Sequence, residues 1–215
     1  QQLTEGASIE EWKQAAGMAW NIDRAPVQFA TNDADGNPFD IGIINDKHVL
    51  YRSDNKQALG VVSDNYKTVQ PGEVLEFFRD LVAGQGFTLS TAGTLFGGKR
   101  MWALASVGES AKIIGNQDEI GGFLLLSTSC DGTSATEARF TTVRVVCNNT
   151  LSMAKSHKEG TIVRLSHKSV FDPQGMKDKL GIARDSFASF LAATRQLANC
   201  KIDQQKARDF VQALI

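Results

Sequence analysis

The residues with the clearest chemical potential are six cations between Ala135 and Lys168: Arg139, Arg144, Lys155, Lys158, Arg164 and Lys168. Only two anions, Glu137 and Glu159, lie in the same stretch, so it carries an excess of four positive charges. The whole chain has a formal net charge of −1, which leaves −5 for the remaining residues. A local cationic segment on an acidic chain is expected for a confined polyanion site. The alternative interpretation is a solvated surface that happens to be basic.

A second candidate site begins at Gly93, because Gly93, Gly98 and Lys99 have the spacing of a phosphate-binding loop. That loop needs Ser or Thr after the lysine and then a helix, whereas Arg100 and an alternating strand follow here. We therefore favour a two-residue hairpin turn at Gly97-Gly98. Such a turn would place Lys99 and Arg100 next to each other at its tip.

No group of residues has a recognisable catalytic spacing. A polar cluster at one strand end (Ser127, Ser129, Cys130 and Asp131) lacks a partner base, and Cys147 has no clear relation to His157. A nucleophile needs an activating base within hydrogen-bond reach, and a buried cysteine is usually only a small apolar residue. We predict no catalytic residues and consider an enzyme the less favoured alternative.

Metal and cofactor sites are not expected either. The three histidines do not pair at metal-ligand spacing. Asp33-x-Asp35-Gly36 begins like a calcium loop but lacks the closing Glu and the flanking helices, so we favour a hairpin turn there. We predict no metal ion and no cofactor.

Length and composition indicate a globular protein. Of the 215 residues, 42% are hydrophobic and 22% are charged, which is enough apolar material for a core. The sequence contains no run of about 18 apolar residues, the length that a membrane-spanning helix needs, and its N-terminus does not resemble a signal peptide. Three widely spaced cysteines predict free buried thiols in a reducing compartment, hence a cytoplasmic protein. A missing initial Met and a helical pattern that reaches Ile215 suggest part of a longer protein.

Alternating apolar residues predict an antiparallel sheet in the middle of the chain. Strands are expected at residues 87–96 and 101–107, with Met101, Ala103, Ala105 and Val107 on one face and Trp102, Leu104 and Ser106 on the other. A third strand follows at residues 122–130, and Asp131-Gly132 is typical of the turn that returns the chain. Further strands are expected at residues 26–31, 39–52 and 161–166.

Helices are expected on either side of these strands, at residues 9–19, 71–83, 172–198 and from 203 onward. Ser8 and Glu11 have the spacing of a capping box, and Pro71 and Pro173 suit a first helical turn. Residues 143–154 fit a helix or a strand, and the longer helical pattern favours the helix. On that helix Arg144, Asn148, Ser152 and Lys155 would share the polar face.

The simplest architecture is a single α+β domain over residues 1–215. Its antiparallel sheet, a hairpin plus a third strand, would be packed by helices. The core would span about residues 20–170, followed by a helical C-terminal extension over about residues 172–215.

Three motifs resemble a known family. Leu124-Leu-Leu-Ser-Thr-Ser-Cys-Asp-Gly-Thr-Ser-Ala135 and Thr142-Val-Arg-Val-Val-Cys-Asn-Asn-Thr-Leu151 resemble the signature of the phage/plasmid-like proteins, a domain of unknown function. Leu59-Gly-Val-Val-Ser-Asp-Asn-Tyr-Lys-Thr-Val-Gln70 and the helix from Met176 to Leu197 are similar to two further parts of it. The resemblance covers roughly residues 17 to 200. It implies a cytoplasmic protein of a bacterial mobile genetic element and no particular biochemical activity.

The order of elements also resembles the core of single-strand annealing proteins of the Red-beta, RecT and Rad-fifty-two types. The shared order is a helix, a hairpin, a third strand and a cation-bearing helix. That resemblance implies a ring or filament that holds single-stranded DNA by its phosphates between a hairpin and a helix, without ATP. No clear motif is shared, and a likeness of fold order does not establish function.

We therefore expect a non-enzymatic homo-oligomer that binds and anneals single-stranded DNA during recombination. Its expected contacts to DNA are Lys99, Arg100, Arg139, Arg144, Asn148, Lys155, Lys158, Arg164 and Lys168. Trp102 and Tyr66 are candidate base-stacking platforms, or else core residues. Exposed sheet edges, with Trp12, Trp20 and Phe210, would join neighbouring subunits. The alternative function is a phage or plasmid factor that binds a host protein.

Overall fold

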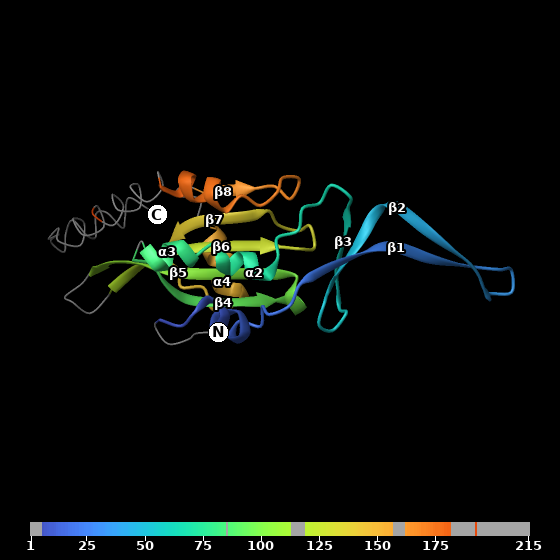
Figure 1. The fold of residues 1–215 in the computed structure, drawn as a ribbon, viewed down its shortest axis with the longest axis horizontal. Coiled ribbons are helices and arrows are strands. Elements are labelled where there is room, and N and C mark those ends of the chain that lie inside the picture. The colour runs from blue at the N-terminus through green and yellow to red at the C-terminus, as the bar shows by residue number, and fades with distance from the viewer. Residues whose placement is uncertain (1–5, 85, 113–118, 157–161, 182–191, 193–215) are drawn as a thin grey trace, which may run out of the picture.

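Two antiparallel sheets form the protein, which confirms the predicted α+β class (Figure 1). The computed structural model describes residues 6–84, 86–112, 119–156, 162–181 and 192. The first sheet has the order β1-β2-β3: β1 (Ile22–Asn32), β2 (Pro38–Arg52) and β3 (Ala58–Ser63). The second is a meander in sequence order: β4 (Thr88–Leu95), β5 (Arg100–Lys112), β6 (Glu119–Ser129), β7 (Thr136–Thr141) and β8 (Ile162–Leu165).

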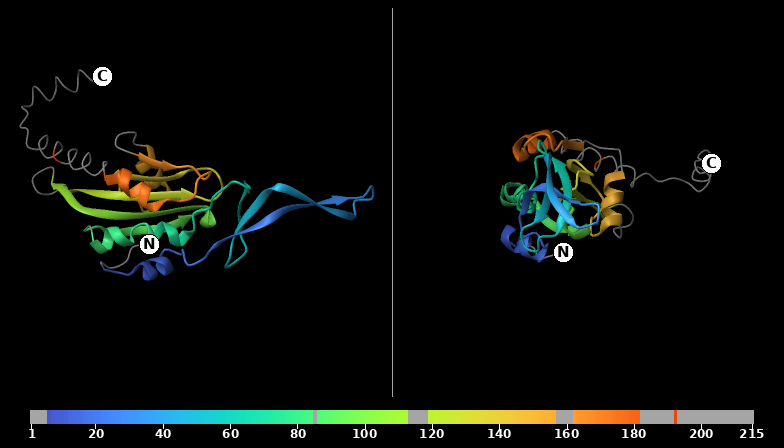
Figure 2. Two further views of the ribbon diagram at one scale, coloured as in Figure 1. Left: turned by 45° about the horizontal axis from the view of Figure 1, so that its top comes forward. Right: turned by 90° about the vertical axis from the view of Figure 1, so that its right-hand side faces the viewer.

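The β1–β2 hairpin projects from the rest of the molecule (Figures 1 and 2). Its turn contains Asp33 and Gly36, as predicted, and Asp33 accepts hydrogen bonds from the backbone N–H groups of Asp35 and Asn37. β3 pairs only with the second half of β2, from Lys47 to Tyr51. The distal half of the hairpin is therefore a two-stranded ribbon.

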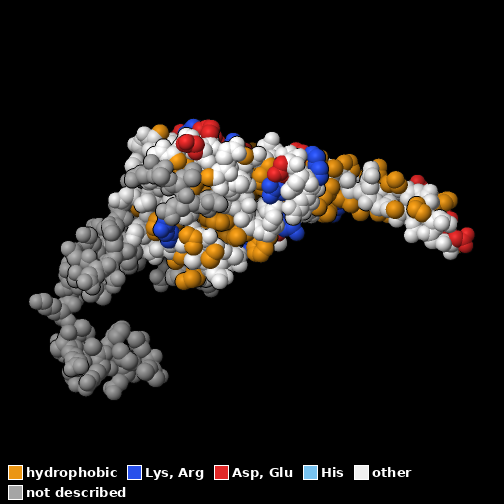
Figure 3. All heavy atoms as spheres, turned by 90° about the horizontal axis from the view of Figure 1, so that it is seen from below, with side chains coloured by type: hydrophobic (Ala, Val, Ile, Leu, Met, Phe, Trp, Pro, Cys, Tyr) orange, Lys and Arg blue, Asp and Glu red, His pale blue; other side chains and the backbone are white. Residues whose placement is uncertain are grey.

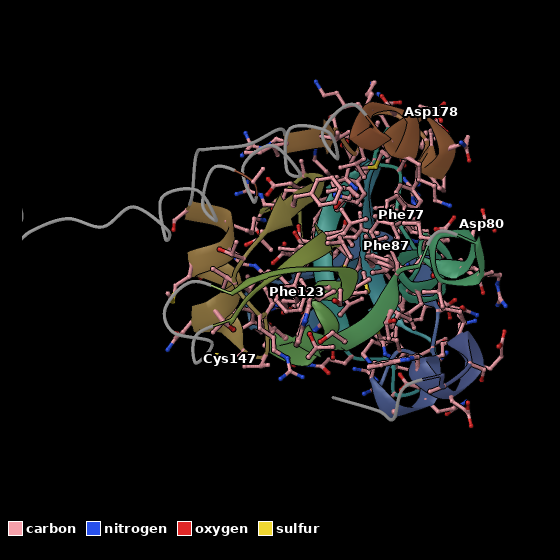
Figure 4. All side chains as sticks on the ribbon, turned by 90° about the vertical axis from the view of Figure 1, so that its left-hand side faces the viewer. Phe77, Asp80, Phe87, Phe123, Cys147 and Asp178 are labelled. Atoms are coloured by element: carbon pink, nitrogen blue, oxygen red, sulfur yellow. The ribbon has the colours of Figure 1, made fainter. Side chains whose placement is uncertain are left out.

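The five-stranded sheet has a helix layer on each face, as the view in Figure 4 shows. One face packs on α1 (Ile9–Ala15), α2 (Pro71–Glu76), α3 (Arg79–Gly84) and the helix at residues 173–181. The other packs on α4 (Asn148–Ser156). The predicted alternation along β5 is confirmed, because Met101 and Ala103 lie in the first cluster whereas Trp102 and Leu104 lie in the second.

The starts of the helices follow the predicted signals. Ser8 and Glu11 form the capping box of α1, with the Ser8 backbone N–H 2.7 Å from Glu11 Oε2. Asp172 caps the helix at residues 173–181 by accepting a hydrogen bond from the Gly175 backbone N–H at 2.9 Å. The helices predicted beyond residue 192 lie outside the described residues.

One predicted helix is divided into two. Residues 71–83 form α2 and α3, which are separated by Phe77 and Phe78, both about fully buried. The Phe78 backbone N–H donates to Leu75 O, three residues back, as in a tightened turn.

The predicted helix over residues 143–154 is correct from Asn148 onward and wrong before it. Thr150 Oγ1 accepts hydrogen bonds from the backbone N–H groups of Val146 and Cys147, at 2.9 and 3.0 Å. These bonds give the preceding segment an irregular path and let α4 start at Asn148.

The Gly93–Arg100 segment is a hairpin and not a nucleotide-binding loop. A short 3-10 turn, η1 (Phe96–Gly98), joins β4 to β5, so the turn is longer than the predicted two residues. Gly97 and Gly98 both have positive φ, and a Cβ on Gly98 would lie 2.7 Å from the Trp20 ring. The close approach of Trp20 explains the need for glycine at position 98.

Candidate nucleic-acid interface

Five charged side chains from four elements converge beside the C-terminal end of α4. They are Arg100 at the start of β5, Glu137 and Arg139 on β7, Arg164 on β8 and Lys155 on α4. Because Ala138 faces the opposite core, its neighbours Glu137 and Arg139 face α4, and Arg164 lies opposite Glu137 in the strand register. Antiparallel pairing thus assembles residues that are far apart in the sequence. We call Arg100, Lys155 and Arg164 the cationic face.

A buried ion pair supports this cluster. Arg139 Nη2 lies 2.6 Å from Glu137 Oε1, and the two side chains are only 3% and 4% exposed. Arg139 Nη1 also donates to Ala154 O and Lys155 O, at 2.8 and 3.1 Å. These are carbonyl groups of the last helical turn, which lack partners within a helix. Arg139 therefore fastens the end of α4 to the sheet.

Arg164 completes the pairing from the solvent side. Its Nε donates to Glu137 Oε2 at 2.9 Å, while its side chain is 62% exposed. One carboxylate thus faces two guanidinium groups, one buried and one accessible. The local charge stays positive.

Lys155 is held where its charge is disfavoured. Burial lowers the pKa of Lys155, and the nearby cations Arg100, Arg139 and Arg164 lower it further, while Glu137 acts in the opposite direction. Its Nζ donates a hydrogen bond to Ser134 Oγ at 2.8 Å. An added anion at this position would be attracted by a cation cluster that, within the described part of the chain, is balanced by Glu137 alone.

A hollow of about 370 Å³ lies between α4 and the sheet. It is lined by Arg100, Ser127, Thr128, Leu151, Ser152, Lys155 and Ser156. Arg100 Nε and the hydroxyl of Ser127, which is 2% exposed, are buried without a hydrogen-bond partner among the described residues. Each can donate a hydrogen bond, so each is a donor that the described residues leave unused.

A larger hollow of about 1000 Å³ lies between β3 and the turn that joins β6 to β7. Arg164, Lys168 and Lys67 contribute its cations. Ser134 lines the larger hollow and Lys155 lines the smaller one. Because the Lys155 Nζ donates a hydrogen bond to Ser134 Oγ, the two hollows are neighbours. Cations line both hollows.

The structure gathers some of the predicted contact residues and separates others. Arg100, Lys155, Arg164 and Lys168 line the two hollows. Arg144 is exposed before α4, Lys99 is half-buried in the β4–β5 turn, and Asn148 begins α4. Lys158 lies outside the described residues.

Two predicted contacts are contradicted by their burial. Arg139 belongs to the buried pair described above, and Trp102 is 4% exposed within the core under α4. Neither side chain is accessible to DNA. Tyr66 is also committed to the fold, because its ring stacks on His167 with centroids 4.5 Å apart and its hydroxyl donates to Ser129 O.

The structure also bears on the predictions for the tryptophans and the cysteines. Trp12 and Trp20 are 1% and 6% exposed, so they support their own core and not a neighbouring subunit. Cys130 is buried as expected, whereas Cys147 is exposed. Phe210 and Cys200 lie outside the described residues.

The sequence analysis missed Ser127, Ser134 and Lys67 as residues of the site. Ser127 has the same parity along β6 as Leu125, which packs under α4, so strand alternation could have placed it on this face. Ser134 and Lys67 lie in turns, where no periodic pattern indicates direction.

No helix among the described residues is long and apolar enough to cross a membrane. The described part of the chain contains no group of three or more His, Cys, Asp or Glu side chains that could hold a metal ion.

Comparison with known proteins gives one match. A family model described as "Domain of unknown function (DUF932)" matches residues 58–215. No curated protein and no solved structure matches the chain. The family match begins at the first residue of β3, after the β1–β2 hairpin.

Proposed function

The chain belongs to the DUF932 family, and we propose that it is a non-enzymatic protein that binds and anneals single-stranded DNA through the cationic face. The observation that carries the proposal is the convergence of Arg100, Lys155 and Arg164 beside a hollow with unpaired buried donors. Phosphate oxygens accept hydrogen bonds and neutralise such cations.

Single strands suit this surface better than a duplex. The two hollows flank Ser134 and are narrow features at the ends of strands, whereas a duplex needs a broad cationic surface or an element that enters a groove. With Trp102 buried, no described aromatic residue of the predicted set remains for stacking. We therefore propose phosphate contacts as the main source of affinity, with little sequence preference.

The biological setting is also a proposal. The resemblance of the motifs at residues 124–135 and 142–151 to phage/plasmid-like proteins supports a cytoplasmic role in a bacterial mobile element. In the structure β7 lies between the third strand, β6, and the cation-bearing helix, α4, so the order of elements matches the annealing proteins only from α2 to β6. ATP-independent annealing is proposed from that partial resemblance. Protein binding is the second candidate function, and the apolar hairpin described below favours it.

The test is fluorescence anisotropy with labelled oligothymidylate and with a duplex of equal length, at several salt concentrations. Arg100→Gln with Lys155→Gln should weaken binding and reduce the salt slope by about 0.7 for each lost phosphate contact. Lys47→Gln with Lys56→Gln removes the same charge elsewhere and should leave the slope unchanged. Equal binding by both double variants would overturn the proposed site.

A further inference from the structure

The β1–β2 hairpin exposes large apolar side chains that nothing in the described chain covers. We call residues 25–46 the arm. Phe39, Ile41 and Ile43 are 78%, 65% and 54% exposed, and Figure 3 shows hydrophobic side chains along the arm with acidic groups at its tip. A two-stranded hairpin alone is marginally stable in water, and exposed apolar patches usually mark an interaction surface. The arm therefore needs a partner.

Exposed apolar side chains lie on both faces of the arm. Ile41 and Ile43 alternate along β2 and point the same way, with Ala30 opposite Ile41, while Phe39 lies at the register irregularity between the Thr31–Asp40 and Asn32–Pro38 pairs. On the other face the Phe29 ring lies over Gly42, and Phe29 and Ile44 are 49% and 39% exposed. We call Phe39, Ile41 and Ile43, the three most exposed of these residues, the apolar stripe.

Charge indicates what the partner is. The arm contains four aspartates and no Lys or Arg, and only Asp46 has a cation, Lys47, within ion-pair distance. Asp33, Asp35 and Asp40 would repel a second arm lying alongside. They complement the cationic face, where the ring of Phe96, 56% exposed, lies 5.2 Å from the Arg100 guanidinium. That face therefore offers both an apolar contact and cations.

We propose that the arm of one copy docks on the cationic face of a second copy of this chain. The apolar stripe packs near Phe96, and the aspartates pair with Arg100 and Lys155. Such a contact is heterologous, so it generates a ring or a filament. Its test is made without DNA and does not depend on DNA binding, although the arm and single-stranded DNA would both bind the cationic face of the proposed function.

The experiment is light scattering on the full chain at micromolar concentration, without DNA. The arm variant is Ile41→Thr with Ile43→Thr, which keeps β-branched side chains in the strand. The face variant is Arg100→Gln with Lys155→Gln, and the control is the exposed Val170→Thr. Both variants should be monomeric where the wild type and the control are oligomeric, with association weakened by about tenfold for each lost anchor.

Mixing gives the decisive result. The arm variant keeps an intact face and the face variant keeps an intact arm, so an equimolar mixture should form a one-to-one dimer and nothing larger. A contact between two arms predicts no such rescue. A further variant, Asp35→Asn with Asp40→Asn, keeps the apolar stripe and should weaken association most at low salt.

The proposal is overturned if the wild type is monomeric, if the arm variant assembles like the wild type, or if the mixture stays monomeric. Circular dichroism of each variant shows whether it is folded. If both variants are folded and their mixture is still monomeric, misfolding does not explain the missing dimer. DNA binding is measured separately, with oligothymidylate. If the arm variant assembles like the wild type but the wild type binds oligothymidylate, this inference fails and the proposed function stands. If assembly requires the arm but the wild type does not bind oligothymidylate, the proposed function fails and this inference stands.

Discussion

Replacing Glu137 with Gln should strongly destabilise the fold, because this carboxylate is the partner of a buried guanidinium. Glu137 and Arg139 are 4% and 3% exposed, and their atoms Oε1 and Nη2 lie 2.6 Å apart. The amide would remove the negative charge and nearly preserve the shape. Arg139 would then lose the negative charge of its buried partner.

The size of the effect follows from burial. Removing one partner of a buried pair costs about 3–5 kcal/mol, because the remaining charge stays desolvated. Arg139 keeps its hydrogen bonds to Ala154 O and Lys155 O, which favours the lower part of that range. Since domains are stable by only about 5–15 kcal/mol, this loss should be plain in the urea midpoint.

Arg164 supplies the matched control. It binds the same carboxylate at 2.9 Å, but its side chain is 62% exposed. Exposed pairs contribute about 0–1 kcal/mol, so Arg164→Gln should shift the free energy of unfolding little. Urea unfolding of both variants, with unchanged m-values, makes the comparison. A Glu137→Gln loss as small as that of Arg164→Gln would refute the argument that Arg139 is a structural residue.

Three further outcomes are expected. Hydrogen bonding to Thr150 lowers the pKa of Cys147, whereas burial raises the pKa of Cys130 to about 12. Iodoacetamide should therefore modify Cys147 faster than Cys130 at pH 7, and Thr150→Val should slow the modification of Cys147. Peptide mass spectrometry over a pH series would measure both rates. Because the folded-state pKa of Lys155 is lowered, the free energy of unfolding should rise with pH as Lys155 loses its proton in the folded state. Lys155→Met should flatten that rise without lowering the melting temperature at pH 7. The same variant should bind oligothymidylate more weakly than the wild type. Oligothymidylate should also disperse the low-salt oligomer, since both would occupy the cationic face, and light scattering would detect an oligomer that persists instead.

The sequence predicted the main sheet because its physics is local. The alternation from Met101 to Val107 and the turn residues Asp131 and Gly132 determine faces and reversals within a few residues. The same reasoning correctly predicted a hairpin after Gly93 and not a nucleotide-binding loop. The break between α2 and α3 was missed, because it depends on how Phe77 and Phe78 both reach the core.

The candidate site was only partly predictable. The excess of positive charge between Ala135 and Lys168 was visible, but charge alone does not separate a ligand-facing cation from a structural one. Arg139 and Arg164 are of the same type and bind the same carboxylate, yet Arg139 on the inner strand β7 is buried and Arg164 on the edge strand β8 is exposed. That difference depends on the pairing of β7 with β8, which joins residues 23 positions or more apart.

The net charge of −1 was also a poor guide to binding, and the fold explains why. The arm holds four aspartates and no cation, and it projects away from the body that carries Arg100, Lys155 and Arg164 (Figure 1). Screening in physiological salt acts over about 8 Å, so charges on a projecting hairpin do little to neutralise a distant surface of the same copy. The cationic face would therefore present a basic surface to a polyanion, although the chain as a whole is slightly acidic. The same separation gives each copy one acidic apolar element and one basic surface, which is the arrangement that head-to-tail association between copies requires.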